Sequence, residues 1–157
     1  MSYSEDPLLP TARLRTMQIV AAAMILGVAM TLAILAIIRS MGNGPPPPQV
    51  PIFTYVGVGL AFVGVIGHFI VPRSISPAQQ LADGKISWLA IYQTRMIVGM
   101  ALLEGPALYQ GIAYFIEGQA LALGLVGLLL LGMILQFPTR GRVQQWLESR
   151  EEQDDRS

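Results

Sequence analysis

The chain has 157 residues, of which 53% are hydrophobic and only 13% charged, about half the charged share of an ordinary soluble domain. Ten basic residues balance ten acidic ones, so no overall positive charge points to a nucleic-acid partner. With no cysteine and a single histidine, the chain offers no thiolate metal site, no thiol nucleophile and no typical zinc site. These counts favour a membrane protein without a metal or cofactor of its own.

Four long apolar runs divide the chain. Each is close to the length of about 20 residues that a helix needs to cross the hydrocarbon of a bilayer. Backbone polar groups in lipid must bond within their own segment, so each run should be a helix. The predicted parts are a segment at 1–16, transmembrane helices at 17–38, 52–71, 88–116 and 120–137, and a tail at 138–157. We therefore predict an all-α membrane protein with four transmembrane helices, and the lipid bilayer as its first partner.

The basic residues of the short loops lie mostly on one side of these helices. Arg39 alone lies on the other side. The majority are Arg13, Arg15, Arg73, Lys85, Arg95, Arg140 and Arg142. Because cytoplasmic loops carry the excess of Lys and Arg, both termini should be cytoplasmic, and we expect the inner (plasma) membrane of a bacterium.

Two connecting segments have a distinct composition. Residues 41–51 contain the run GNGPPPP, which favours a stiff polyproline link, either a plain spacer or a docking site for a partner. In the tail, Val143 and Leu147 are four residues apart and are predicted to lie on the membrane surface. The acidic end of the tail is predicted to be solvated and disordered.

An internal repeat relates residues 14–38 to residues 92–116. At an offset of 78 residues, eight of the 25 aligned positions are identical. We interpret this as two tandem helical hairpins that enter the membrane from the same side, with convergence of apolar sequence as the alternative. At one position the repeat differs in chemistry, because Leu26 in the first copy corresponds to Glu104 in the second.

Glu104 is the candidate functional residue, because it lies near the middle of an apolar run. A carboxyl at that depth should be protonated, paired or in a polar cavity. Pro106 cannot donate a hydrogen bond, which frees the carbonyl of Leu102, and Tyr109 and Gln110 offer further polar groups. Two hypotheses follow. Glu104, Tyr109 and Gln110 bind a proton or cation reversibly, or Glu104 bonds across a helix interface in a purely structural role.

Small residues and one histidine indicate how the helices contact one another. We predict that a face of helix 88–116 contacts helix 52–71, because small residues let two backbones approach closely. The predicted contact residues are Ala101, Ala107 and Gly111 on one helix and Gly57, Gly59 and Gly64 on the other. His68 is either an interhelical hydrogen-bonding residue or a proton relay, and Arg95 is expected to reach the interface.

The sequence GMALLEGPALY, from Gly99 to Tyr109, resembles the carboxylate-bearing helix of the rotary ATPase proteolipids, the subunit c family. The run GVGLAFVGVIG at 57–67 is similar to the glycine-rich partner helix of that family, so the resemblance covers about residues 53–115. It implies that Glu104 binds the transported proton or sodium ion. It also implies a homo-oligomer or other membrane subunits as partners. Pro106 and the place of this hairpin in the middle of the chain depart from the family pattern.

The expected function is therefore that of a subunit in an ion-translocating complex, and not of an enzyme by itself. The sequence lacks the nucleotide-binding and hydrolase motifs that would suggest otherwise. The alternative is a non-enzymatic structural or assembly protein of the membrane.

Overall fold

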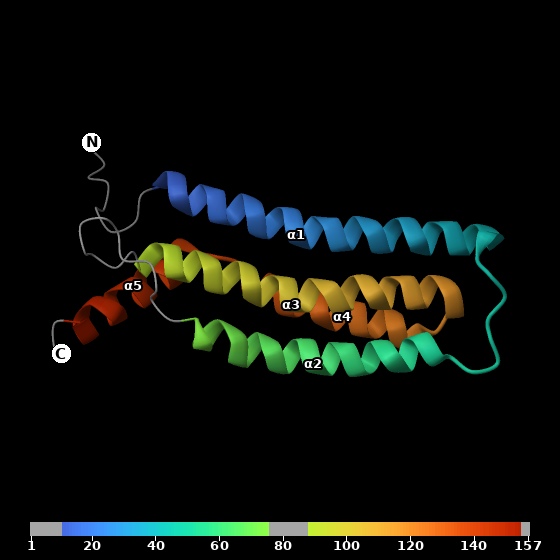
Figure 1. Cartoon of the computed structure of the whole chain (residues 1–157). Coiled ribbons are helices and arrows are strands. Elements are labelled where there is room, and N and C mark those ends of the chain that lie inside the picture. Colours follow the sequence, from blue (N-terminus) through green and yellow to red (C-terminus); the bar gives the residue numbers. More distant parts are fainter. Residues whose placement is uncertain (1–10, 76–87, 155–157) are drawn as a thin grey trace.

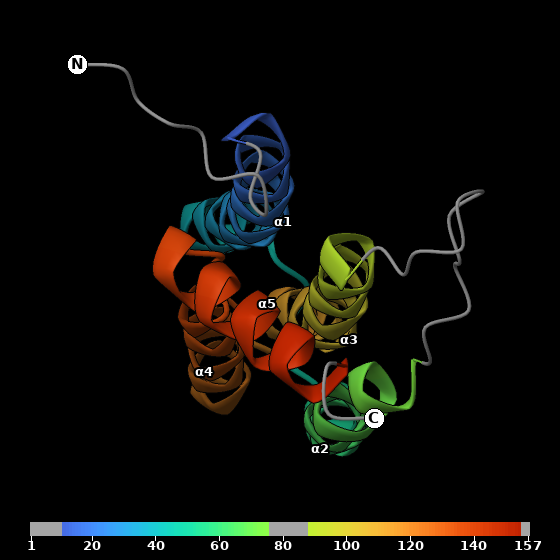
Figure 2. The same ribbon diagram turned by 90° about the vertical axis from the view of Figure 1, so that its left-hand side faces the viewer.

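A computed structural model describes residues 11–75 and 88–154, and its regular structure is entirely helical. The elements are α1 (Thr11–Ile38), the π-helical turn η1 (Arg39–Asn43), α2 (Ile52–Ser74), α3 (Trp88–Glu117), α4 (Ala120–Leu135) and α5 (Arg140–Asp154). The first four α-helices run side by side, and α5 crosses one end of them (Figures 1 and 2). That end, where α1 and α3 begin, is called the α5 end below. The opposite end, where α3 turns into α4, is called the Gly118 end.

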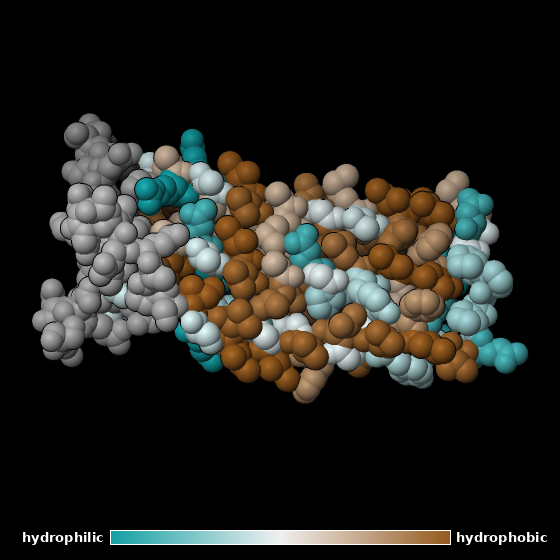
Figure 3. All heavy atoms as spheres, viewed as in Figure 1, coloured by the Kyte–Doolittle hydropathy of each residue, from teal (hydrophilic) through white to brown (hydrophobic). Residues whose placement is uncertain are grey.

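The helices have the length and composition of membrane spans. The segments Thr11–Asn43, Ile52–Ser74 and Trp88–Glu117 are each long and apolar enough to cross a membrane. A fourth candidate is α4 taken together with the start of α5, which are bent by 63° at the break between them. On the face shown in Figure 3, the surface between the two ends is mainly hydrophobic. By helix length and composition the chain is an integral, multi-pass membrane protein, and the predicted all-α class with four apolar helices is confirmed.

The third helix is the centre of the bundle. It packs against α1, α2 and α4, and Ile112 is its only exposed large hydrophobic residue. In contrast, α1, α2 and α4 each direct a row of large apolar side chains outward. Met17, Met100 and Met133, from α1, α3 and α4, are fully buried, and their flexible side chains suit the irregular spaces between helices. The two predicted hairpins therefore do not pack as separate units, because α1 rests on α3.

Glycine controls how closely α2 approaches α3. A Cβ atom at Gly64 would lie 2.5 Å from the carbonyl oxygen of Leu102 and 2.8 Å from the Pro106 ring. Pro106 has no N–H to donate to the Leu102 carbonyl. This carbonyl is instead covered by the α2 backbone at Gly64. At Gly57 a Cβ would lie 2.6 Å from the Gln110 side chain. Both glycines are required by close contact rather than by backbone conformation.

The predicted contact face was only partly right. Gly57 and Gly64 do lie against α3, but a Cβ at Gly59 would meet nothing within 4 Å. On α3, Gly111 faces Leu32 and Leu35 of α1 instead of α2, and Ala101 is exposed. Helical periodicity alone does not say which neighbour a strip of small residues meets.

The tail also differs from its prediction. The fourth apolar helix ends at Leu135 rather than at 137, and α5 continues as helix to Asp154, through most of the segment predicted to be disordered. Val143 and Leu147 are 0% and 4% exposed and belong to the same core as the bundle. They therefore pack against the protein and not on a membrane surface. Some of the sequence predictions concern residues that the structure does not describe, namely residues 1–10, Lys85 and residues 155–157.

Candidate functional site

Glu104 lies midway along α3, on a strip of the helix that faces α1. It is seven residues, about two turns, from Gly111, which contacts Leu32 and Leu35 of α1. Its side chain is half-buried. Within residues 11–75 and 88–154 no group lies within hydrogen-bonding distance of its carboxyl. The carboxyl is therefore partly buried and unpaired within this part of the chain.

The predicted companions of Glu104 lie on other sides of α3. At about 100° per residue, Gln110 is about 240° and Tyr109 about 140° around the helix from Glu104. Gln110 is fully buried against α2, where its Nε2 donates to the Thr54 carbonyl at 3.4 Å. Tyr109 is half-buried. Because the Leu102 carbonyl is covered by Gly64, these groups do not gather around Glu104 within one chain.

His68 lies on α2, on the far side of α3 from Glu104. Its Nδ1 is 3.1 Å from the carbonyl oxygen of Gly99, and its ring meets Phe69 edge-on at 5.1 Å between centroids. Gly99 leaves space for the imidazole, since a Cβ there would lie 3.1 Å from Nδ1. The geometry is that of an interhelical hydrogen bond between α2 and α3, and the relay role of His68 stays a prediction.

A second acid on α3 is Glu117, the last residue of the helix. Its side chain is 1% exposed. One carboxylate oxygen accepts from the backbone N–H of Phe53 and the other from that of Thr54, each at 2.7 Å. Those two N–H groups belong to the first turn of α2, where helix geometry leaves donors without partners. An acceptor-only carboxylate there also suits the positive end of the helix dipole.

A signal for this contact exists in the sequence. The residue before α2 is Pro51, which makes no side-chain cap, and the first turn of α2 contains no acidic residue. A buried helix start without a capping side chain of its own needs an acceptor from elsewhere. Glu117 is the acid at the same end of the bundle.

Arg39 connects α1 to α3 at the Gly118 end of the bundle. Its guanidinium donates to the carbonyl of Phe115 in the last turn of α3 and lies 5.9 Å from the centre of the Tyr114 ring. A cation near the last carbonyls of a helix is favourable. Gly118 has φ of +70° and leaves room for the guanidinium where a Cβ would collide with it. Arg39 and Glu117 thus link α1, α2 and α3 at the Gly118 end.

Comparison of this chain with protein-family models, with curated proteins and with solved structures gives no match. The resemblance to the rotary ATPase proteolipids therefore remains a prediction from the residues of α2 and α3.

Proposed function

We propose that this protein is a subunit of an oligomeric membrane complex in which Glu104 binds a proton or a cation reversibly. The observation that supports the proposal is the half-buried Glu104 carboxyl, midway along α3 and without a hydrogen-bonding partner in the described chain. An unpaired carboxylate in hydrocarbon costs several kcal/mol. A proton, a cation or a group from a neighbouring subunit would remove that cost.

A structural role is the second candidate, and the rest of α3 favours it. Gln110 and Glu117, the other buried polar side chains of this helix, both bond to the backbone of α2. If Glu104 follows the pattern of these two side chains, it bonds to the backbone of a helix in a partner subunit and holds that helix in place. The two candidates differ in one property: a structural carboxyl keeps one protonation state, whereas an ion-binding carboxyl changes it.

Labelling with a hydrophobic carbodiimide, which reacts with protonated carboxyls, tests the proposal. We expect modification of Glu104 in the intact complex, faster at acid than at alkaline pH and slowed by a cation that binds there. Glu104→Gln should abolish the labelling, and Glu117→Gln, the matched change on the same helix, should preserve it. Failure to label Glu104 at any pH in a folded oligomer would contradict ion binding. A protein that is monomeric in mild detergent and in bilayers would contradict the oligomer.

The orientation belongs to the same proposal: the α5 end faces the cytoplasm of a bacterium. The bias of basic residues toward that end supports it. Because the chain has no cysteine, single substitutions report accessibility cleanly. In intact cells an impermeant maleimide should label Ser40→Cys, near the Gly118 end, and spare Ser149→Cys on α5. The reverse pattern would overturn the orientation.

A further inference from the structure

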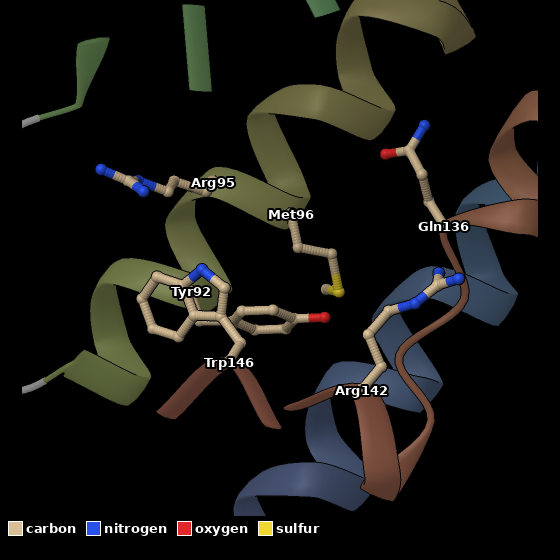
Figure 4. A pocket seen from close by; sticks show the side chains of 6 residues that line it. All are labelled: Tyr92, Arg95, Met96, Gln136, Arg142 and Trp146. Carbon is tan, nitrogen blue, oxygen red and sulfur yellow. The ribbon is translucent and has the colours of Figure 1, made fainter. Parts of the chain in front are cut away.

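A cavity of about 200 Å³ lies at the α5 end and is independent of Glu104. Three helices or their ends contribute to its wall, so it exists only in the assembled bundle. The lining residues are Tyr92, Arg95 and Met96 of α3, Gln136 at the end of α4, and Arg142 and Trp146 of α5. Figure 4 shows these side chains.

Two polar groups of this cavity, the Tyr92 hydroxyl and the Arg142 guanidinium, can donate hydrogen bonds into it. The Tyr92 hydroxyl points toward Arg142 (Figure 4), and it has no hydrogen-bonding partner within the described residues. The Arg142 guanidinium uses one N–H for the Leu135 carbonyl at 2.5 Å, and an arginine carries five. The Trp146 ring lies against Tyr92 with 5.3 Å between ring centres and a 60° angle between the ring planes, and it forms that side of the cavity. Such a set of donors suits a phosphate or carboxylate group.

A second cavity, of about 250 Å³, is apolar apart from His68 and Gln136. It lies between α2, α3 and α4, and Gln136 lines both cavities. Its other lining residues are Val65, Phe69, Leu103, Leu128, Leu129, Gly132 and Leu135. Gln136 therefore lies between the cavity that contains Tyr92 and Arg142 and a second, more apolar cavity.

The short α4 accounts for this arrangement. Its 16 residues rise only about 24 Å, less than the roughly 30 Å of hydrocarbon. The chain then bends by 63° into α5. The carbonyls left at the break are satisfied by side chains, because Gln18 donates to Pro138 at 3.1 Å and Arg142 donates to Leu135. The break is thus built into the fold, and Gln136 at this break lines both cavities.

We propose that the two cavities together bind one acidic phospholipid from the surrounding bilayer. Its phosphate lies against Arg142 and Tyr92, and one acyl chain enters the apolar cavity beside Leu128 and Leu135. A free phosphate would satisfy only the donors. The apolar lining of the second cavity favours a lipid as the occupant.

Native mass spectrometry of the full chain, released from vesicles of phosphatidylglycerol or of phosphatidylcholine with the same acyl chains, tests the proposal. We expect one phosphatidylglycerol to be retained, and phosphatidylcholine to be retained far less. Arg142→Gln should lower retention about tenfold, as loss of a hydrogen bond to a charged group does. Arg140→Gln removes the same charge from an exposed position outside the cavity and should change retention less than twofold.

Tyr92→Phe provides a milder variant, because it removes the hydroxyl and keeps the aromatic contact with Trp146. It should also weaken retention of phosphatidylglycerol, by several-fold. Equal retention of the two lipids, or equal loss in the Arg140 and Arg142 variants, would overturn the proposal. Complete displacement of the lipid by millimolar inorganic phosphate would also overturn it, because the cavity would then recognise the phosphate alone.

Discussion

The side of α3 that faces α2 and the side that carries Glu104 differ in how their polar groups are bonded. Toward α2, the Leu102 carbonyl is covered by Gly64, Gln110 bonds to Thr54, and Glu117 bonds two backbone N–H groups. Toward α1, Glu104 is half-buried and bonds to nothing in the described chain. Two acids on one helix, thirteen residues or about 20 Å apart, thus have opposite surroundings.

The difference separates structural polar groups from a group that requires an external partner. In lipid the gain from apolar burial between helices is small, so close packing and interhelical hydrogen bonds hold the bundle together. The α2 side of α3 supplies both. Glu104 supplies neither within one chain, and it should therefore matter for function or assembly rather than for the fold of the single chain. The following predictions test this difference between the two sides of α3.

The largest effect is expected from Gly64→Leu. Even a Cβ at this position would lie 2.5 Å from backbone, so α2 must move away from α3. We expect a loss of about 3 kcal/mol or more in the free energy of unfolding, at the upper end of overpacking costs, measured by denaturation in detergent micelles. Gly59→Leu is the matched control, since Gly59 faces open space. Equal losses in the two variants would show that the contact with Leu102 is not what limits packing.

Glu117→Ala should cost about 2–3 kcal/mol in the same measurement. The substitution leaves the N–H groups of Phe53 and Thr54 buried without an acceptor, and hydrogen bonds to charged groups are the costly ones to lose. Hydrogen exchange should increase first at the start of α2. A stability within about 0.5 kcal/mol of wild type would mean that water or lipid replaces the carboxylate.

Gln110→Leu should change stability by less than about 1 kcal/mol. The amide makes one long hydrogen bond of 3.4 Å, and its Oε1 is buried without a partner. Replacing a poorly satisfied polar group by an apolar one of similar size is close to neutral. A large loss would show that Gln110 is bonded more strongly than the 3.4 Å distance indicates, and would extend the contrast between the two sides of α3.

Glu104→Gln should leave the stability of the single chain within about 0.5 kcal/mol of wild type, because no contact in the described chain is lost. Thermal unfolding in a detergent that separates the subunits checks this. A clear loss of stability, comparable to that of Glu117→Ala, would assign Glu104 a bonding role within the bundle and remove the contrast.

Much of the fold could be predicted from the sequence, because each helix follows from the composition of its own segment. Runs such as 17–38 are apolar and nearly free of charge, so their helical structure follows from the need to bond every backbone group in lipid. The role of Glu117 could not be predicted in the same way. It depends on a contact with Phe53 and Thr54, which are more than sixty residues away, and an acid before a glycine looks like an ordinary turn.

The packing of the tail was missed for a related reason. Val143 and Leu147 form an apolar strip that fits either a lipid surface or a protein surface, and the sequence does not distinguish them. The structure places the strip in the same buried core as the helix bundle. Likewise, the strip with Gly111 could meet α1 or α2, and only the arrangement of the helices decides. Depth in the membrane is thus easier to predict than direction around a helix axis.

The protonation state of Glu104 in the intact complex tests the central claim most directly. The measurement is the infrared carboxyl stretch, taken as the difference between wild type and Glu104→Gln across a pH series in lipid bilayers, with Glu117→Gln as the matched control. Reversible ion binding predicts a protonated-carboxyl band that disappears as the pH rises, that returns on acidification, and that is absent only from the Glu104 variant. A Glu104 signal that does not change with pH or with added cations, whether protonated or ionised, would contradict the proposal.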